Sequence, residues 1–125
     1  MSEPRAPESP LEVSRYIGHV LRQKRSLIDL MHSAGLEARA KRAEAVRAES
    51  RAFLRAEGAM DLRKHTARVD AQVCRLQDAA DIAEEVLKHL RMRIEQCSDE
   101  IEGSRTVAAT LRAEFSVLGM SDEGS

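Results

Sequence analysis

Hydrophobic positions between residues 62 and 118 recur at alternating steps of four and three. None of the positions in this row is charged, although 33% of the residues in the chain are Asp, Glu, Lys or Arg. Such spacing keeps one stripe on the surface of a supercoiled helix, so it predicts a continuous coiled-coil helix over residues 62–118. The row, called the heptad row below, is predicted to form an oligomerisation or partner interface, and it includes Val73, Leu76, Leu87, Leu90, Ile94, Ile101, Leu111, Phe115 and Leu118.

A second helix is predicted over residues 10–57. Ser9-Pro10-Leu11-Glu12 matches a capping box with proline at the first helical position, which indicates a helix that begins at Pro10. The same steps then connect Val13, Ile17, Val20, Lys24, Leu27 and Met31. The pattern loses phase near residues 33–35 and resumes with Leu36, Ala43, Val46, Ser50, Phe53 and Leu54. Either two helices meet near Gly35 or one helix contains a phase slip.

The stretch "EGAMD" predicts a turn over residues 58–61 that joins the two arms. Gly58 is suited to end the first helix with a positive φ, and Asp61 is a good N-cap for the second. The predicted fold is therefore all-α: an antiparallel helical hairpin or coiled coil with a long C-terminal helix, forming an oligomer. A strip of Ala79, Ile82 and Val86 beside the heptad row widens the apolar face. The long arm should extend past Pro10, leaving Leu111, Phe115 and Leu118 as a dimerisation or partner surface.

Composition agrees with long helices. Aromatic residues make up 2% of the chain, and all three prolines lie within the first ten residues. Residues 1–9 read as a disordered leader without the apolar segment of a signal peptide, and residues 119–125 as a disordered tail. No apolar run is long enough to cross a bilayer, so we expect a cytoplasmic protein without membrane contacts. Cys74 and Cys97, separated by roughly 35 Å on one helix, cannot pair and should be reduced thiols.

Charge is distributed unevenly along the chain. Residues 39–68 contain nine Lys or Arg and four Asp or Glu, whereas residues 69–125 contain six and twelve. A basic middle segment and an acidic C-terminal half indicate either two antiparallel arms with complementary surfaces or a basic segment that binds a partner. A basic cluster near the turn includes Arg47, Arg51, Arg55, Arg63, Lys64 and Arg68. These residues either solubilise the helices and pair with the acidic arm, contact nucleic-acid phosphates through Arg55, Arg63, Lys64 and Arg68, or bind an acidic protein.

Motifs for chemistry are absent from the sequence. The four histidines form no i,i+4 pair and have no cysteine at ligand spacing, and there is no glycine-rich phosphate loop. We therefore predict no metal, no cofactor, no catalytic residue and no enzymatic activity. Cys97 is expected to be a small core residue, and Cys74 to point outward. Gly103, inside the predicted long helix, marks either a slight bend or the close approach of another backbone.

Two blocks resemble a family of small coiled-coil proteins from actinobacterial phages and prophages. In "FLRAEGAMDLRKHTA" the matching positions are Phe53, Leu54, Ala56, Glu57, Gly58, Met60, Asp61, Arg63 and Lys64, with Ala59 where the family has Ser. The block "IEGSRTVAATLRAEFSVLG" is similar to that family's Gly-Arg-Thr followed by Leu-Arg-Ala-Glu, with one extra residue in Gly103-Ser104-Arg105-Thr106. The resemblance covers about residues 40–119. It implies a phage protein encoded near recombination or replication genes, and it supplies no catalytic residue.

The sequence therefore favours a non-enzymatic helical interaction protein of phage type in the host cytoplasm. It would form a homo-oligomer, bind another phage or host protein, or do both, as an accessory to phage DNA recombination or replication. Three alternatives stay open: direct nucleic-acid binding through the basic hairpin tip, virion assembly or scaffolding, and inhibition of a host nuclease.

Overall fold

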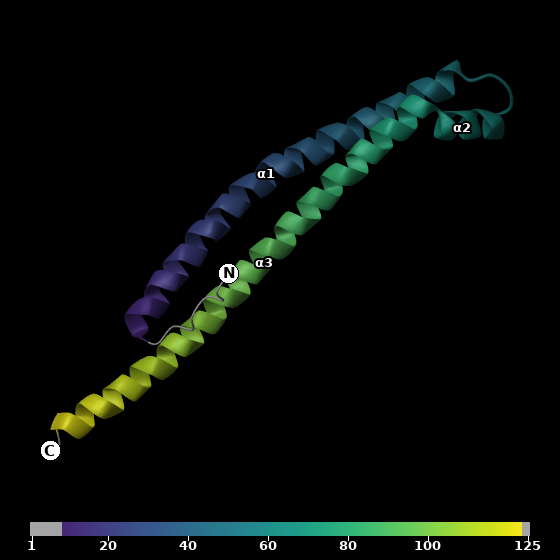
Figure 1. Ribbon diagram of the computed structural model, residues 1–125. Helices are drawn as coiled ribbons and strands as arrows, with labels where there is room; N and C mark the ends of the chain where they lie inside the picture. Colours follow the sequence, from purple (N-terminus) through teal and green to yellow (C-terminus); the bar gives the residue numbers. More distant parts are fainter. Residues whose placement is uncertain (1–8, 124–125) are drawn as a thin grey trace, which may run out of the picture. The chain divides into compact units, whose positions relative to one another are not determined.

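The computed structural model describes residues 9–123 and contains three helices in that range (Figure 1). They are α1 (Pro10–Arg55), α2 (Met60–Val69) and α3 (Ala71–Glu123), and no strand occurs among the residues described. The predicted all-α class and helical hairpin are confirmed. Residues 1–8 of the predicted leader and residues 124–125 of the predicted tail lie outside the described residues. Residues 119–123, predicted as disordered tail, belong to α3.

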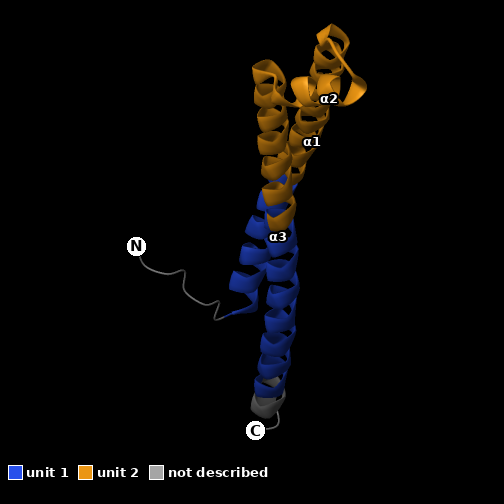
Figure 2. Ribbon diagram, turned by 90° about the vertical axis from the view of Figure 1, so that its right-hand side faces the viewer, with its two compact units in different colours: residues 1–27, 93–125 blue, residues 28–92 orange. Residues whose placement is uncertain are grey.

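The chain divides into two compact units, residues 1–27 with 93–125 and residues 28–92 (Figure 2). In the first unit the start of α1 packs antiparallel to the later part of α3. Its buried side chains repeat at heptad spacing on both helices: Val13, Val20 and Leu27 on α1, and Cys97, Ile101 and Ala108 on α3. Cys97 is thus a core residue, as predicted.

The start of α1 agrees with the predicted capping box. Pro10 is the first helical residue, and the backbone N–H of Glu12 donates to Oγ of Ser9 at 3.2 Å. The backbone N–H of Val13 donates to the carbonyl of Ser9 at 3.1 Å. Ser9 is therefore the N-cap residue, because its side chain accepts from a backbone group that has no partner within the first turn.

In the second unit α1 continues without a break through residues 33–35. Two helices do not meet near Gly35, so α1 is a single helix here. The phase slip considered for a single helix is also not observed. The buried row keeps its original frame on small side chains: Ala38, Ala45, Ala48 and Ala52. The residues expected to resume the row lie outside it, with Leu36 68%, Val46 55% and Leu54 74% exposed. Alanine supplies the contact because a side chain of one carbon lets the neighbouring helix approach closely.

The predicted continuous helix over residues 62–118 is wrong at Asp70. Helix α2 ends at Val69, and α3 begins at Ala71. Oδ1 of Asp70 accepts a hydrogen bond from the backbone N–H of Val73 at 3.0 Å, which makes Asp70 the N-cap of α3. The heptad row is consequently out of frame before the break: Leu62 and Val69 are exposed, and Ala67 is buried in their place.

The connection between α1 and α2 contains Gly58, whose φ of 107° lies in the left-handed region. A Cβ at this position would lie 2.8 Å from Cδ2 of Leu62, so both conformation and space favour glycine. The positive φ agrees with the prediction, but the cap does not. Ala59, without a side-chain cap bond, is the N-cap of α2, and Asp61 lies inside its first turn.

Helix α2 lies beside the end of α1 and the start of α3 in the second unit (Figures 1 and 2). The three helices meet in a small core of Ala48, Ala52, Ala67 and Val73, against which Phe53 and Leu76 pack. Ala67 is the residue that α2 contributes to this core, and it packs against short side chains of α1 and α3. These contacts hold the tip of the hairpin together.

From Val73 onward the heptad row lies where the sequence places it. Val73 and Ile101 are buried, and Leu76, Leu87, Leu90, Ile94 and Leu111 are half-buried. Each unit covers its part of the row with its own part of α1, so this part of the predicted partner interface is already occupied within the chain. No atom of another described segment would lie within 4 Å of a methyl group at Gly103, so the close backbone approach considered for this glycine is not observed.

Candidate helix-docking surfaces

An open groove of about 920 Å³ runs between α1 and α3 in the second unit. We call it the basic groove. Apolar side chains line it along α1 through Leu36, Ala43 and Val46, and Leu87 lines it from α3. Leu36 and Val46 are more than half exposed. They lie on α1 beside the alanine row, so the residues that were expected to continue the core instead form the wall of a groove.

Arginine side chains surround this apolar wall. Arg39, Arg42 and Arg47 come from α1, and Arg91 from α3. Only Arg42 has acidic partners: its Nε and Nη2 donate to the carboxylate of Glu84, and Nη2 also donates to Asp81. Among the residues the structure describes, Arg39, Arg47 and Arg91 form no ion pair. The groove therefore combines an apolar surface with three guanidinium groups available to an anionic partner.

A smaller groove of about 440 Å³, the tip groove, continues along α1 towards α2 and shares Val46 with the basic groove. Phe53 and Leu54 line it from α1, and Lys64 and Arg68 line it from α2. The sequence predicts Lys64 and Arg68 as contacts for nucleic acid or an acidic partner, and these two residues lie together, one helical turn apart.

The other two predicted contact residues lie elsewhere. The guanidinium carbon of Arg63 lies 5.9 Å from the centroid of the Phe53 ring, in cation–π geometry, and its Nε is buried without a hydrogen-bond partner. Arg55, the last residue of α1, is exposed and lines neither of these grooves. The four predicted contact residues are therefore divided: one packs against the hairpin tip, two line the tip groove, and Arg55 does neither.

On the other side of the same helix pair lies a third groove of about 320 Å³. Ile82 and Val86 line it and are 65% and 49% exposed, with Ala79 beside them. These are the residues of the strip predicted beside the heptad row. A Lys41–Glu37 pair at 3.9 Å lies on its α1 side, so this groove has no net charge from that pair.

The end of α3 provides the fourth surface, in the first unit. There α3 extends beyond the start of α1 (Figure 1), and Phe115 and Leu118 are 52% and 60% exposed. Leu111, one step earlier in the row, is half-buried. The sequence predicts that these three residues overhang the N-terminal arm; the last two agree with that prediction, and Leu111 lies at the edge of the covered region. We call residues 112–118, beyond that edge, the overhang.

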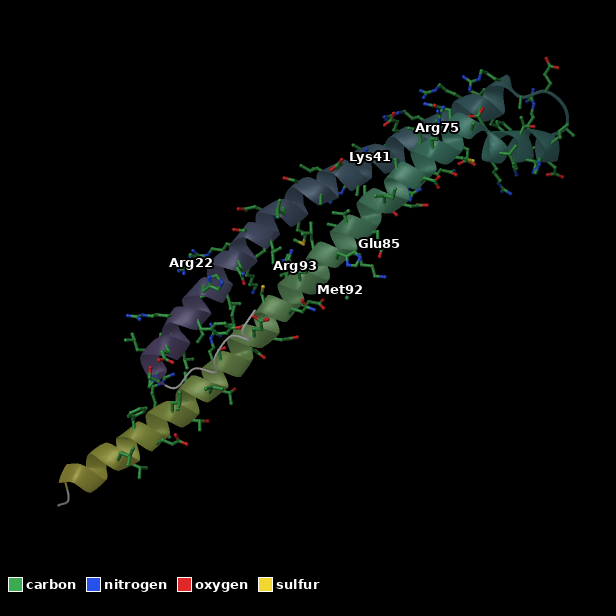
Figure 3. All side chains as sticks on the ribbon, viewed as in Figure 1. Arg22, Lys41, Arg75, Glu85, Met92 and Arg93 are labelled. Carbon is green, nitrogen blue, oxygen red and sulfur yellow. The ribbon has the colours of Figure 1, made fainter. Side chains whose placement is uncertain are left out.

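The remaining candidate chemistry is sparse. Glu85 extends from α3 away from α1 (Figure 3), and its Oε1 lies 3.4 Å from Nε2 of His89, one turn further on. Cys74, expected to point outward, is half-buried, and its thiol donates to the carbonyl of Arg68 at 3.2 Å. Both cysteines are free thiols. Within residues 9–123 no three His, Cys, Asp or Glu side chains lie where they could hold a metal ion.

Comparison with known proteins adds no relative. The chain matches no family model, no curated protein and no solved structure. None of the described helices is both long and apolar enough to span a membrane.

Proposed function

We propose that this protein is a non-enzymatic helical adaptor that binds a helix of another polypeptide, in the cytoplasm, as an accessory to phage DNA recombination or replication. The observation that carries the proposal is the basic groove, in which exposed apolar side chains at heptad spacing lie between unpaired arginines. Grooves of this kind accept amphipathic helices that insert apolar residues at i, i+3 and i+7. The phage setting rests on the resemblance of residues 53–64 to a phage family.

Capture of partners from phage-infected cells tests this proposal. The full chain would serve as bait beside a Val46→Glu variant, which places a charge in the wall of the groove without filling the core. We expect a recombination or replication protein to be retained by the wild-type chain and lost with Val46→Glu. Recovery of capsid or tail components would favour virion assembly instead, and equal retention by both baits would contradict docking in the groove.

Direct nucleic-acid binding is a second candidate, supported by Lys64 and Arg68 beside Phe53 in the tip groove. Binding through phosphate contacts weakens with salt, and each contact adds about 0.9 to the slope of log affinity against log salt concentration for duplex DNA. Replacing both residues with glutamine should reduce that slope by about 1.8. The same change at Arg22 and Arg25, two exposed arginines of the first unit, is the matched control. A chain that shows no affinity for DNA at low salt would remove this candidate.

A further inference from the structure

The basic groove lies between two antiparallel helices whose register is fixed by contacts inside the second unit. Arg42 on α1 donates to Glu84 on α3, and a Cβ at Gly35 would lie 4.0 Å from Cδ1 of Leu87. Residue numbers therefore rise along α1 as they fall along α3. Arg91, one turn after Leu87, is thus level with the part of α1 one turn before Gly35, at the end of the groove.

This register spaces three arginines evenly along the groove. Arg91 lies one turn before the level of Gly35, Arg39 lies one turn after it, and Arg47 follows two turns later. At about 1.5 Å per residue, each interval between neighbouring arginines is roughly 12 Å. A helix lying along the groove covers the same distance in about seven or eight residues. Three positions of such a helix, each two turns apart on one face, therefore come level with the three guanidinium groups.

The groove carries more positive charge than its own chain neutralises. The three arginines are exposed, and none of them forms an ion pair with the residues that the structure describes. Glu84 is the acidic residue that lines the groove, and it is already hydrogen-bonded to Arg42. The third groove, on the other side of the helix pair, instead has Lys41 beside Glu37. An occupant with acidic side chains gives each free guanidinium group a partner, whereas a basic occupant is repelled.

The surface between the arginines is apolar, which determines the rest of the occupant's chemistry. Leu36 and Val46 are 68% and 55% exposed, and Leu87 is half-buried between the helices. The phosphates of a nucleic acid could pair with the arginines but would leave this apolar surface in water. A second copy presenting the same face would oppose arginine to arginine. An amphipathic helix buries the apolar surface with its own apolar row and reaches the arginines from acidic residues beside that row.

We propose that the basic groove binds an amphipathic helix of a different polypeptide, with apolar residues at steps of three and four and an acidic residue beside them in each of three successive heptads. This inference rests on the proposed function and specifies the chemistry of its partner. The groove wall on α1 extends from Met31 to Arg47, roughly 24 Å, so the bound segment is about 16 residues long. Its apolar area is small, which places the contact among the weak, transient interfaces that bury less than about 1,200 Å².

Binding of synthetic peptides of about 21 residues to the full chain, followed by fluorescence anisotropy, tests this assignment. The acidic peptide has Leu at the first and fourth positions of each heptad and Glu at the fifth and seventh, where the glutamates repel one another and keep the free peptide monomeric. The basic peptide has Lys in place of every Glu. The shuffled peptide has the composition of the acidic one without an apolar row. We expect micromolar binding of the acidic peptide, weaker at high salt, and binding of the other two at least about tenfold weaker.

Two groove variants separate the contribution of charge from that of the apolar wall. Arg39→Glu with Arg47→Glu should weaken binding of the acidic peptide about tenfold or more and strengthen binding of the basic peptide. Leu36→Gln with Val46→Gln keeps the charge of the groove but removes its exposed apolar side chains, and should also weaken binding of the acidic peptide about tenfold. All four side chains are exposed, so circular dichroism should report unchanged helicity for both variants.

The matched control for charge is Arg22→Glu with Arg25→Glu. Both arginines are exposed on α1 in the first unit, so the variant has the same net charge as the arginine variant of the groove. Its affinity for the acidic peptide should stay within about twofold of that of the wild-type chain, because charges beyond the Debye length of about 10 Å are largely screened in 0.1 M salt.

Four results would overturn the inference: equal affinity for the acidic and basic peptides, no binding of the acidic peptide, unchanged binding in the Arg39 and Arg47 variant, or displacement of the acidic peptide by duplex DNA that itself binds through these two arginines. The last result would reassign the groove to nucleic acid. Equal affinity that is lost with Leu36→Gln and Val46→Gln would overturn the acidic partner and leave helix docking in place. If the peptides do not bind but capture of a partner protein still depends on Val46, the inference fails and the proposed function stands.

Discussion

Arg42 on α1 joins Glu84 on α3 through two hydrogen bonds, one from Nε to Oε1 and one from Nη2 to Oε2, each 2.9 Å long. The guanidinium plane matches the carboxylate, which makes this pair more specific in geometry than a lysine contact would be. Both side chains are partly exposed, so solvent screens the attraction. The pair therefore sets the register of the two helices in the second unit more than it stabilises them.

The contribution of this pair should depend on pH. The hydrogen bonds from Arg42 lower the pKa of the Glu84 carboxyl below its ordinary value of 4.5. The unfolded chain then binds this proton more readily than the folded chain, so the stabilisation is present above pH 4.5 and is lost as the pH falls through the lowered pKa. We expect Arg42→Gln to lower the Tm slightly at pH 7 and to have no effect in strong acid. Arg39→Gln is the control, and a Tm difference independent of pH would contradict the assignment.

Asp70 should be more important for stability than Asp61, although the sequence favours Asp61 as a cap. Asp70→Ala removes the bond from its Oδ1 to the N–H of Val73 and should reduce the free energy of unfolding by about 1 kcal/mol. Asp61→Ala removes no cap bond and should change it by a few tenths of a kcal/mol at most. Urea unfolding of both variants compares the two sites directly. A larger loss with Asp61→Ala than with Asp70→Ala would contradict the conclusion that Asp70 is the more important cap.

Alanine substitution should have opposite effects at two glycines. Gly58→Ala forces a side chain into a φ of 107° and against Leu62, so we expect a loss of about 1–3 kcal/mol in the free energy of unfolding. Gly103→Ala lies inside α3 with open space around it and should increase that free energy by about 1 kcal/mol. Chemical denaturation measures both, and destabilisation by Gly103→Ala would indicate a contact that the single chain does not contain.

The alanine row of α1 should not accept larger side chains. Ala48 is 5% exposed in the core shared by the three helices, so Ala48→Leu must separate them and should cost about 1–3 kcal/mol. Ala40 is exposed on the same helix, and Ala40→Leu should be nearly neutral. The two variants have the same composition, so any difference in their thermal unfolding reports the position alone. Equal Tm values would mean that α1 can move away from its neighbours at no cost.

Much of the fold follows from spacing and caps that are local in sequence. The frame of the row from Val73 to Leu111, the start of α1 at Pro10 and the positive φ of Gly58 are all as predicted. One error in the predicted core arises where a small residue is buried and a larger apolar residue nearby is exposed. Leu36 and Val46 are more hydrophobic than Ala38 and Ala45, so the sequence favours them as the buried row, although the alanines continue the original 3,4 spacing. Asp70 was missed because the row crosses it without a change of frame.

The candidate surfaces were predictable in part. The lengths of the two arms predict that Phe115 and Leu118 overhang. The place of Ile82 and Val86 beside the heptad row predicts a separate exposed apolar strip. The basic groove could not be predicted, because its wall depends on which of two parallel rows on α1 faces α3. Once the alanines are recognised as the buried row, Leu36, Ala43 and Val46 become a second, outward row. The separation of Arg63 from Lys64 and Arg68 follows from helix geometry within α2, because residues four apart share a face whereas adjacent residues point in different directions.

The alanine row also determines how the protein should respond to temperature. Alanine makes up more than half of the buried apolar residues in the described part of the chain, and each exposes only one methyl group when the chain unfolds. The heat capacity of unfolding scales with newly hydrated apolar surface, and ordinary globular domains give about 12–15 cal/mol/K per residue. This chain should give less. Its stability curve would then be broad and shallow, so that cooling strengthens the fold little and warming weakens it gradually.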